Sequence, residues 1–276
     1  MLINCKGTLL SLDTPIVMAI INATPDSFYT TSRVLQHELL KHAEQHLSDG
    51  ATILDIGGVS TRPGADEVSE EEELRRVIPA IEAVHRAFPT AIISVDTFRA
   101  NVAEQAVAVG ASIVNDVSGG RFDPTLWRKV ADLQTPYIYT HSIGTPKTMQ
   151  QNPSYNHITA EVFDFFSANL RMLHSMGIHD IILDVGFGFG KTTAHNYQLL
   201  RDLAVFKHLD CPVLAGISRK GMIWKPLGIA PEEALNGTTA LHIIALQHGA
   251  KILRVHDTKP AMECIKLLEL LTSDLV

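Results

Sequence analysis

The chain lacks the features that mark secreted, membrane and nucleic-acid-binding proteins. Its three cysteines, Cys5, Cys211 and Cys264, lie far apart and form no CxxC pair, so neither a disulfide framework nor a zinc ribbon is expected. A net charge of −7 argues against binding to nucleic acid or an anionic membrane. No apolar run approaches the roughly 18 residues of a membrane span, and the N-terminus has no basic signal region. We therefore expect a soluble, cytoplasmic protein.

What the chain does have is a series of short apolar runs, each followed by a polar or charged residue. The runs and these residues are 16–21 with Asn22, 53–54 with Asp55, 91–95 with Asp96, 113–114 with Asn115, 137–139 with His141, 181–183 with Asp184, 213–215 with Ser218, and 252–253 with Arg254. Strands of a parallel sheet that are buried on both faces are apolar throughout. The polar residues therefore indicate functional groups gathered at the carboxyl ends of the strands.

Segments with helical spacing of apolar residues separate these runs. Ser69 and Glu72 fit a capping box at the start of one such segment, and a further helix is expected over 194–209. Gly50, Gly110 and Gly177, like Gly249 later, stand where a left-handed glycine ends a helix. Strand and helix alternating eight times predict an α/β fold, a (β/α)₈ TIM barrel formed as a single domain by residues 1–276. A doubly wound open sheet is the alternative.

One group of polar residues suits a flat heterocycle. Asp96, Asn115 and Asp184 follow strands, and Lys220 lies just past the seventh. An aspartate accepts hydrogen bonds from a ring N–H and an exocyclic amine together, asparagine can donate or accept, and lysine donates to a ring carbonyl or nitrogen. The edge of an aminopyrimidinone ring offers these partners. The alternative is a set of ion pairs that fills the barrel, an arrangement that rarely improves on apolar side chains.

A second group is cationic. Arg62, Arg219, Arg254 and His256 are expected to converge at the barrel mouth, where they would suit a phosphate or pyrophosphate. The amide oxygen of Asn22 could bind a Mg²⁺ ion that bridges such a group. Solvated surface side chains are the alternative.

The run 186–192, GFGFGKT, lacks the glycine spacing of a Walker loop and of a dinucleotide-binding turn. It predicts a tight glycine turn that exposes Phe187 and Phe189, one of which would wall a pocket for an aromatic ring.

Together these segments resemble the dihydropteroate synthase family. The blocks that carry the resemblance are NATPDSF at 22–28, DIGGVSTRPG at 55–64, SVDT at 94–97, NDVSG at 115–119, PKTMQ at 146–150, GFGFGKT at 186–192, SRK at 218–220 and RVHD at 254–257. They appear in the family's order and span about residues 15–258, nearly the whole chain. No single block is specific, but the set is.

The resemblance implies that 4-aminobenzoate displaces pyrophosphate from 6-hydroxymethyl-7,8-dihydropterin diphosphate, giving 7,8-dihydropteroate for folate synthesis. It assigns the pterin to Asp96, Asn115, Asp184, Lys220, Phe189 and Gly216. It assigns the diphosphate and 4-aminobenzoate to Thr61, Arg62, Pro63, Ser218, Arg254 and His256, with Mg²⁺ on Asn22. Asp96, Lys220, Arg254 and His256 would be catalytic. The pterin ring can delocalise positive charge, so a dissociative, SN1-like displacement is expected, with Asp96 stabilising the cation.

The chain departs from the family at a few places. Tyr29 to Ser32 replace a glycine-containing lid sequence, Val59 stands in place of glutamate, and Val185 in place of proline. Thr140 and Ser142 replace methionines, which predicts a more polar pterin pocket floor.

Three further expectations remain open. The alternatives are a pterin-dependent methyltransferase on the same barrel, which the diphosphate blocks disfavour, and an inactive pterin-binding homologue. The resemblance also suggests a homodimer formed through outer helices, to which Leu267, Leu268, Leu270 and Leu271 would contribute.

Overall fold

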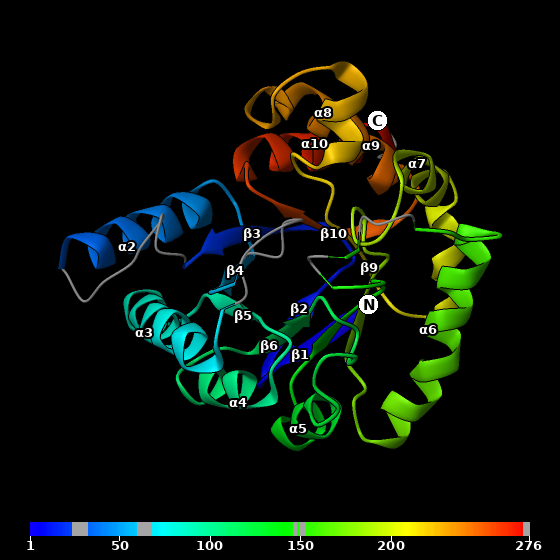
Figure 1. Ribbon diagram of the computed structural model, residues 1–276. Helices are drawn as coiled ribbons and strands as arrows, with labels where there is room; N and C mark the ends of the chain where they lie inside the picture. The colour runs from blue at the N-terminus through cyan, green and yellow to red at the C-terminus, as the bar shows by residue number, and fades with distance from the viewer. Residues whose placement is uncertain (24–32, 60–67, 146–147, 150–152, 273–276) are drawn as a thin grey trace.

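A computed structural model describes residues 1–23, 33–59, 68–145, 148–149 and 153–272. Parallel strands form a closed barrel in the order β10-β3-β4-β5-β6-β7-β8-β9, surrounded by helices (Figure 1). The barrel strands are β3 (Ile16–Asn22), β4 (Ile53–Gly57), β5 (Ile92–Asp96), β6 (Ile113–Asp116), β7 (Tyr137–Thr140), β8 (Ile181–Asp184), β9 (Val213–Ala215) and β10 (Ala250–Val255). Each of the eight apolar runs is therefore a barrel strand, and the open-sheet alternative is wrong.

The helices follow the strands in sequence. They are α2 (Arg33–Ser48), α3 (Glu70–Ala87), α4 (Ala100–Ala108), α5 (Leu126–Leu133), α6 (Ile158–Ser175), α7 (Thr193–Arg201), α8 (Gly221–Leu227), α9 (Leu235–Gln247) and α10 (Thr258–Thr272). The helix expected over 194–209 is divided into α7 and a 3-10 helix, η1 (Leu203–Leu209); a second 3-10 helix is η2 (Pro231–Glu233). Within the described ranges no helix is both long and apolar enough to cross a membrane.

The helix ends follow local chemistry. The Ser69 side chain accepts a hydrogen bond from the Glu72 backbone N–H, but the Glu72 carboxylate binds Arg76 instead of completing the capping box. Gly110 after α4 has φ +125°, and a Cβ there would lie 2.4 Å from Cγ of His85. Both the backbone conformation and the close approach of α3 therefore require glycine at this position.

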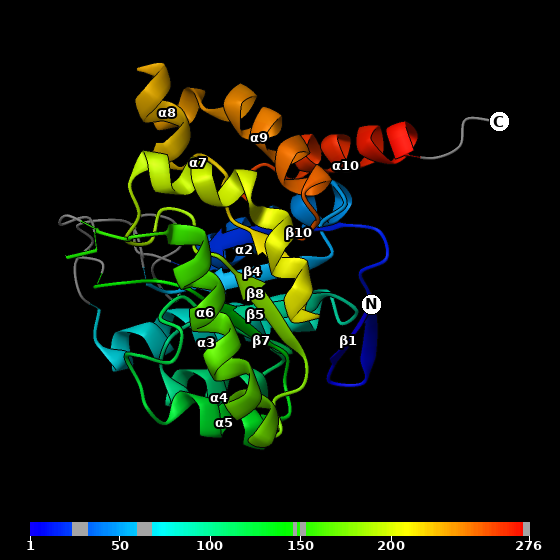
Figure 2. The same cartoon turned by 90° about the vertical axis from the view of Figure 1, so that its right-hand side faces the viewer.

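An N-terminal hairpin closes the amino end of the barrel. Strands β1 (Leu2–Cys5) and β2 (Thr8–Ser11) pair antiparallel, and Figure 2 shows them at the end opposite the loops that follow the strands. The hairpin side chains that face the barrel pack on the barrel residues nearest its amino end. This floor cluster consists of Ile3, Cys5, Leu10, Leu12, Met18, Ile53, Ile92, Ile113, Ile138, Ile182, Leu214 and Ile252.

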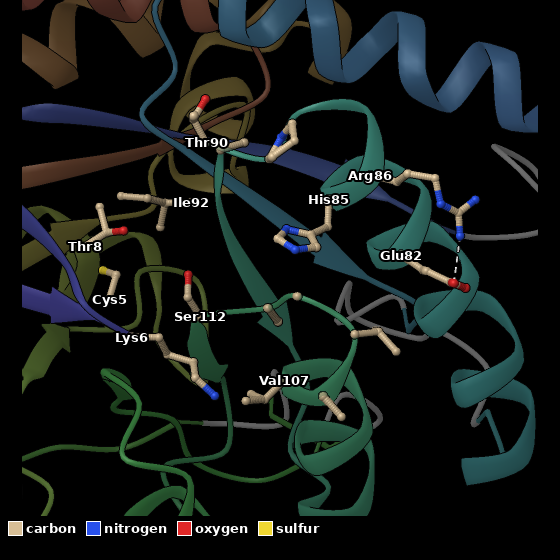
Figure 3. A pocket seen from close by; sticks show the side chains of 16 residues that line it. Cys5, Lys6, Thr8, Glu82, His85, Arg86, Thr90, Ile92, Val107 and Ser112 are labelled. Atoms are coloured by element: carbon tan, nitrogen blue, oxygen red, sulfur yellow. Dashed lines mark hydrogen bonds and ion pairs between the residues drawn. The ribbon is translucent and has the colours of Figure 1, made fainter.

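Beside the hairpin lies a pocket of about 800 Å³. It is lined by residues of the hairpin, by the C-terminal ends of α3 and α4, and by the residues that lead into β5 (Figure 3). Glu82 and Arg86 on its rim are bonded to each other. It lies on the outside of the barrel's amino end, away from the polar strand ends.

Candidate active site

The polar strand ends face the barrel interior because side chains alternate along a strand. Ile53 of β4 belongs to the floor cluster, so Asp55, two residues on, faces the same interior. The same spacing separates Ile182 from Asp184 and Ile252 from Arg254. Neighbouring strands keep this face in register, pairing Gly57 with Asp96 and Asp96 with Asn115. The sequence spacing thus predicts a single interior site, and the fold builds one.

Arg254 joins the two groups of polar residues that the sequence suggested. Its Nε donates to Asp55 Oδ2 at 2.7 Å, and its Nη2 donates to Asp96 Oδ2 at 2.6 Å. Asn115 Nδ2 donates to the same Asp55 oxygen at 3.0 Å. The guanidinium expected at a diphosphate therefore lies against a carboxylate expected at the heterocycle. Asp55 accepts hydrogen bonds from both Arg254 and Asn115 and so links the two groups.

Burial controls the charges of this network. It raises the pKa of Asp96 to about 7, opposed by the adjacent Arg254 cation and reinforced by the Asp55 carboxylate. The pKa of Arg254 is raised above its ordinary value, because attraction to Asp55 and Asp96 outweighs the effect of burial. Arg254 is therefore always cationic, while Asp96 exchanges its proton near neutral pH.

Lys220 lies in the part of the interior that contains Phe189 and Asp184. Its ammonium is 4.6 Å from the centre of the Phe189 ring and donates to the carbonyl oxygen of Phe187. A Cβ on Gly216 would lie 3.6 Å from Lys220 Nζ and 3.8 Å from Asp184 Oδ2, so glycine keeps the space between them open. Burial lowers the pKa of Lys220 to about 8, although Asp184 and Asp96 favour the cation.

The two phenylalanines of the glycine turn differ from the prediction that both are exposed. Phe187 is fully buried in the core beneath the helices. Phe189 is 9% exposed and packs with Val117 and Met149. Only Phe189 presents its ring to the site.

His256 and Ser218 lie side by side at neighbouring strand ends. Nδ1 of His256 is 3.1 Å from Ser218 Oγ, which also accepts from the His256 backbone N–H at 3.2 Å. Arg219, expected with them at a phosphate, instead makes two hydrogen bonds to the Asp257 carboxylate, at 2.7 and 2.8 Å. Its backbone is left-handed, with φ +53°. The contact expected between Arg219 and a phosphate stays a prediction.

The remaining predicted site residues stand at the rim. Asn22 ends β3 opposite Gly57, with its side chain exposed. Thr61, Arg62 and Pro63 lie outside the described residues. No cluster of three or more metal-ligating side chains occurs in the described part of the chain. The Asn22 amide oxygen is of the hard type that Mg²⁺ prefers, and Mg²⁺ commonly uses few protein ligands together with water and substrate phosphates.

The fifth barrel strand, β7, carries Thr140, for which the sequence predicts a polar pocket floor, and leads into His141, to which the sequence analysis assigned no role. Thr140 is fully buried, and its Oγ1 has no hydrogen-bond partner. It pairs in register with Asp184 and is two residues beyond Ile138 of the floor cluster, so it faces the interior. His141 contacts a buried lysine, Lys191. A lysine within an apolar, glycine-rich turn was the available signal for this contact.

Three comparisons bear on this arrangement. The family model described as pterin binding enzyme matches residues 18–256. Dihydropteroate synthase of Escherichia coli K12 is 44% identical over 269 residues, covering 96% of this chain and 94% of that protein. The structure of Xanthomonas albilineans dihydropteroate synthase with 4-aminobenzoic acid has a TM-score of 0.91 at 40% identity, covering 99% and 98% of the two chains. The same enzyme in complex with 7,8-dihydropteroate has a TM-score of 0.88 at 38% identity, covering 99% of each chain.

The closed parallel barrel and its polar interior at the carboxyl ends of the strands define a TIM-barrel enzyme. The family match and the level of identity make the assignment narrower. The chain belongs to the dihydropteroate synthase family of pterin-binding transferases.

Proposed function

We propose that this protein condenses 6-hydroxymethyl-7,8-dihydropterin diphosphate with 4-aminobenzoate, giving 7,8-dihydropteroate and pyrophosphate for folate synthesis. The convergence of Asp96, Asn115, Asp184 and Lys220 inside one barrel carries the proposal. Relatives that cover nearly the whole chain, with 4-aminobenzoic acid or 7,8-dihydropteroate bound, support it.

The pterin would occupy the interior between Lys220 and the opposite carboxylates. Asp184 and Asp96 accept from its ring N–H and amine groups, and Asn115 and Lys220 complete its polar edge. Phe189 provides an aromatic wall, and Gly216 leaves room where a Cβ would approach Asp184 and Lys220. The ionised form of Asp96 is the one that can accept from the heterocycle.

The diphosphate would lie toward the barrel mouth. Arg254, His256 and Ser218 supply donors there, and the assignment extends to Thr61, Arg62 and Pro63, which also adjoin the 4-aminobenzoate. Asn22 would hold a Mg²⁺ ion through its amide oxygen, together with diphosphate and water oxygens. When bound, the ion would neutralise charge on the leaving group.

The displacement is dissociative in this proposal. The bond between the pterin methylene carbon and the diphosphate oxygen breaks first, and its electron pair leaves with pyrophosphate. The resulting cation is delocalised over the pterin ring and stabilised by the Asp96 carboxylate. The aniline nitrogen then forms the new C–N bond and releases one proton to solvent. Because an aniline nitrogen is already nucleophilic, no strong base is required.

The function is tested by mixing the protein with the pterin diphosphate, Mg²⁺ and 4-aminobenzoate and measuring pyrophosphate and dihydropteroate. We expect equal amounts of both products, formed only when both substrates are present. No pyrophosphate release would refute the function. For the mechanism, an isotopic label in the oxygen that joins the methylene carbon to phosphorus should exchange into non-bridging positions of that phosphate without net turnover. A complete absence of exchange, with turnover intact, would contradict an ionised intermediate that returns to substrate.

A homodimer forms part of the proposal. Leu267, Leu270 and Leu271 on α10 are 59%, 58% and 75% exposed, an unusual grouping of large apolar side chains at a surface. We expect light scattering to give twice the mass of the chain. The double substitution Leu270→Glu and Leu271→Glu should give the monomer mass, and an unchanged mass would exclude this face.

A further inference from the structure

Lys191 is a buried lysine that the proposed chemistry does not use, and burial lowers its pKa well below the ordinary value. It is 2% exposed. Its Nζ contacts the carbonyl oxygens of Gly186 at 2.9 Å, Phe189 at 3.1 Å and His141 at 3.1 Å. It also lies 2.9 Å from Nδ1 of His141. In its protonated form the amine carries three N–H donors, one for each of the three carbonyl oxygens.

These partners tie both ends of the glycine turn 186–190 to the end of β7. Gly186, Gly188 and Gly190 have φ of +69°, +83° and +65°. A Cβ on Gly186 would lie 1.9 Å from the His141 carbonyl oxygen, so the turn sits directly on the residue that follows β7. Without the lysine, the three carbonyl oxygens would lose a buried donor, which is energetically costly.

The glycine turn also fixes the position of the Lys220 side chain. The Phe187 carbonyl accepts from Lys220 Nζ, and the Phe189 ring lies beneath that ammonium. A Cβ on Gly188 would lie 3.3 Å from Lys220 Cδ. Three consecutive residues of the turn therefore determine where the Lys220 ammonium lies and how much water reaches it.

We propose that Lys191 is a positioning residue, which places the Lys220 ammonium by holding the glycine turn against β7. The substrate contact of Lys220 rests on the proposed function; the positioning of Lys220 does not. His141 is the neutral partner in this contact. Burial lowers the pKa of His141 to about 2, with smaller contributions from Lys191 and Arg121, so the imidazole adds no charge beside the lysine.

The cost of the arrangement supports a directional role. Burying an ammonium group is unfavourable unless hydrogen bonds compensate for the lost water. A methionine has nearly the same length and would fill the same space without this cost. What methionine lacks is the ability to join three carbonyl oxygens from two segments.

The test is Lys191→Met, with the titration of Lys220 as the main measurement. Competitive acylation followed by mass spectrometry of the Lys220 peptide reports its pKa without substrate. We expect a pKa of about 8 in the parent protein. In Lys191→Met we expect a rise toward the ordinary lysine value of about 10.4, because a loosened turn admits water. The same variant should lose roughly 10- to 100-fold in kcat/KM, as expected for a misplaced substrate contact.

Two further variants keep the test decisive. Thr159→Val removes a partly buried hydrogen bond, from Thr159 Oγ1 to Asp202 Oδ2 at 2.7 Å, which has no partner in common with Lys191. It should lower stability without moving the pKa of Lys220. Asn196→Ala removes the side chain that accepts from the Gly188 N–H at 2.8 Å, and should raise the pKa of Lys220 even if Lys191→Met does not fold.

The outcomes separate the two proposals. An unchanged Lys220 pKa in folded Lys191→Met overturns the positioning role, and so does an unchanged pKa in Asn196→Ala if Lys191→Met does not fold. A shifted pKa in a protein whose parent form releases no pyrophosphate supports the positioning role and refutes the proposed function.

Discussion

The two ends of the barrel are built from the same strands but have opposite chemistry. At the amino end, Ile53, Ile182 and Ile252 pack with the hairpin into a floor that is buried and apolar. Two residues further along the same strands stand Asp55, Asp184 and Arg254. The spacing is the period of a strand, so one face of each strand provides stability at one end and polar groups at the other.

The difference shows where this fold tolerates unfavourable electrostatics. The floor cluster has no polar side chain apart from the Cys5 thiol, while the mouth buries two carboxylates with one guanidinium. Buried ion pairs seldom stabilise a protein more than apolar side chains do. The mouth is therefore a region held together by the rest of the barrel. Substitutions at the two ends should separate function from stability.

Asp96→Asn should have the largest effect. It removes a carboxylate that contacts Arg254 and that we assign to cation stabilisation, so kcat/KM should fall roughly 100- to 1,000-fold. Pyrophosphate release measures the change. Asp13→Asn, the same substitution near the hairpin, is the control and should leave turnover unchanged. Intact turnover in Asp96→Asn would remove the catalytic role of this carboxylate.

Ile138→Ala tests the floor on strand β7. It leaves a cavity in a fully buried cluster, so the free energy of unfolding should fall by about 2–5 kcal/mol. The KM values of both substrates should stay as in the parent protein at temperatures where the variant is folded. Urea unfolding and steady-state kinetics provide the two numbers, and a KM change without loss of stability would invalidate the division between floor and mouth.

His242 of α9, outside the barrel, provides a control in which stability depends on pH. It is 1% exposed with both ring nitrogens unpaired, and burial lowers its pKa from 6.5 to about 4. Because the unfolded chain takes up this proton first, stability is lost as the pH falls from about 6.5 toward 4.

His242→Leu should remove that loss, making the fall in unfolding free energy between pH 6.5 and pH 4 smaller by about 3 kcal/mol. Chemical unfolding at the two pH values measures it. If parent and variant lose stability equally, the acid sensitivity does not arise from His242. It does not arise from Asp96 either, because its raised pKa means that the folded protein takes up that proton before the unfolded chain does.

Thr140→Val should have the smallest effect on stability. The Thr140 hydroxyl is buried without a partner, so its removal should stabilise the protein by about 1 kcal/mol. Thr135→Val is matched to it, because that hydroxyl is also buried and unpaired but lies before β7, toward the amino end. Only Thr140→Val should alter the KM of the pterin substrate. A similar KM change in Thr135→Val would argue against the predicted polar pterin pocket at Thr140.

The sequence predicted the barrel well because its strands are buried on both faces. Each apolar run coincides with a strand, and glycines such as Gly110 mark the ends of helices. The hairpin was missed because β1 and β2 are four residues each with mixed exposure. The short helix α8, which begins at Gly221 and contains Pro226, has no helical signal of its own.

The site was harder to predict in its pairings than in its membership. Their positions at the carboxyl ends of parallel strands predicted that Asp96, Asp184 and Arg254 gather at one site. That Arg254 binds Asp55 could not be read from the chain, because β3 separates β10 from β4 and the contact exists only once the barrel closes. The pairing of Arg219 with Asp257 could not be predicted either, because Arg219 has a left-handed backbone that a non-glycine residue rarely adopts.

The most direct test of the account is calorimetric binding of the pterin diphosphate to the parent protein and to Asp184→Asn, without 4-aminobenzoate. Asp184 is the last residue of β8, and its carboxylate accepts a hydrogen bond from the Gly186 N–H at 2.8 Å. We predict saturable binding at one site per chain and a loss of affinity of roughly tenfold or more in the variant, as for a hydrogen bond to a charged group. Equal affinity in the two proteins would contradict the central claim that the polar strand ends bind the pterin.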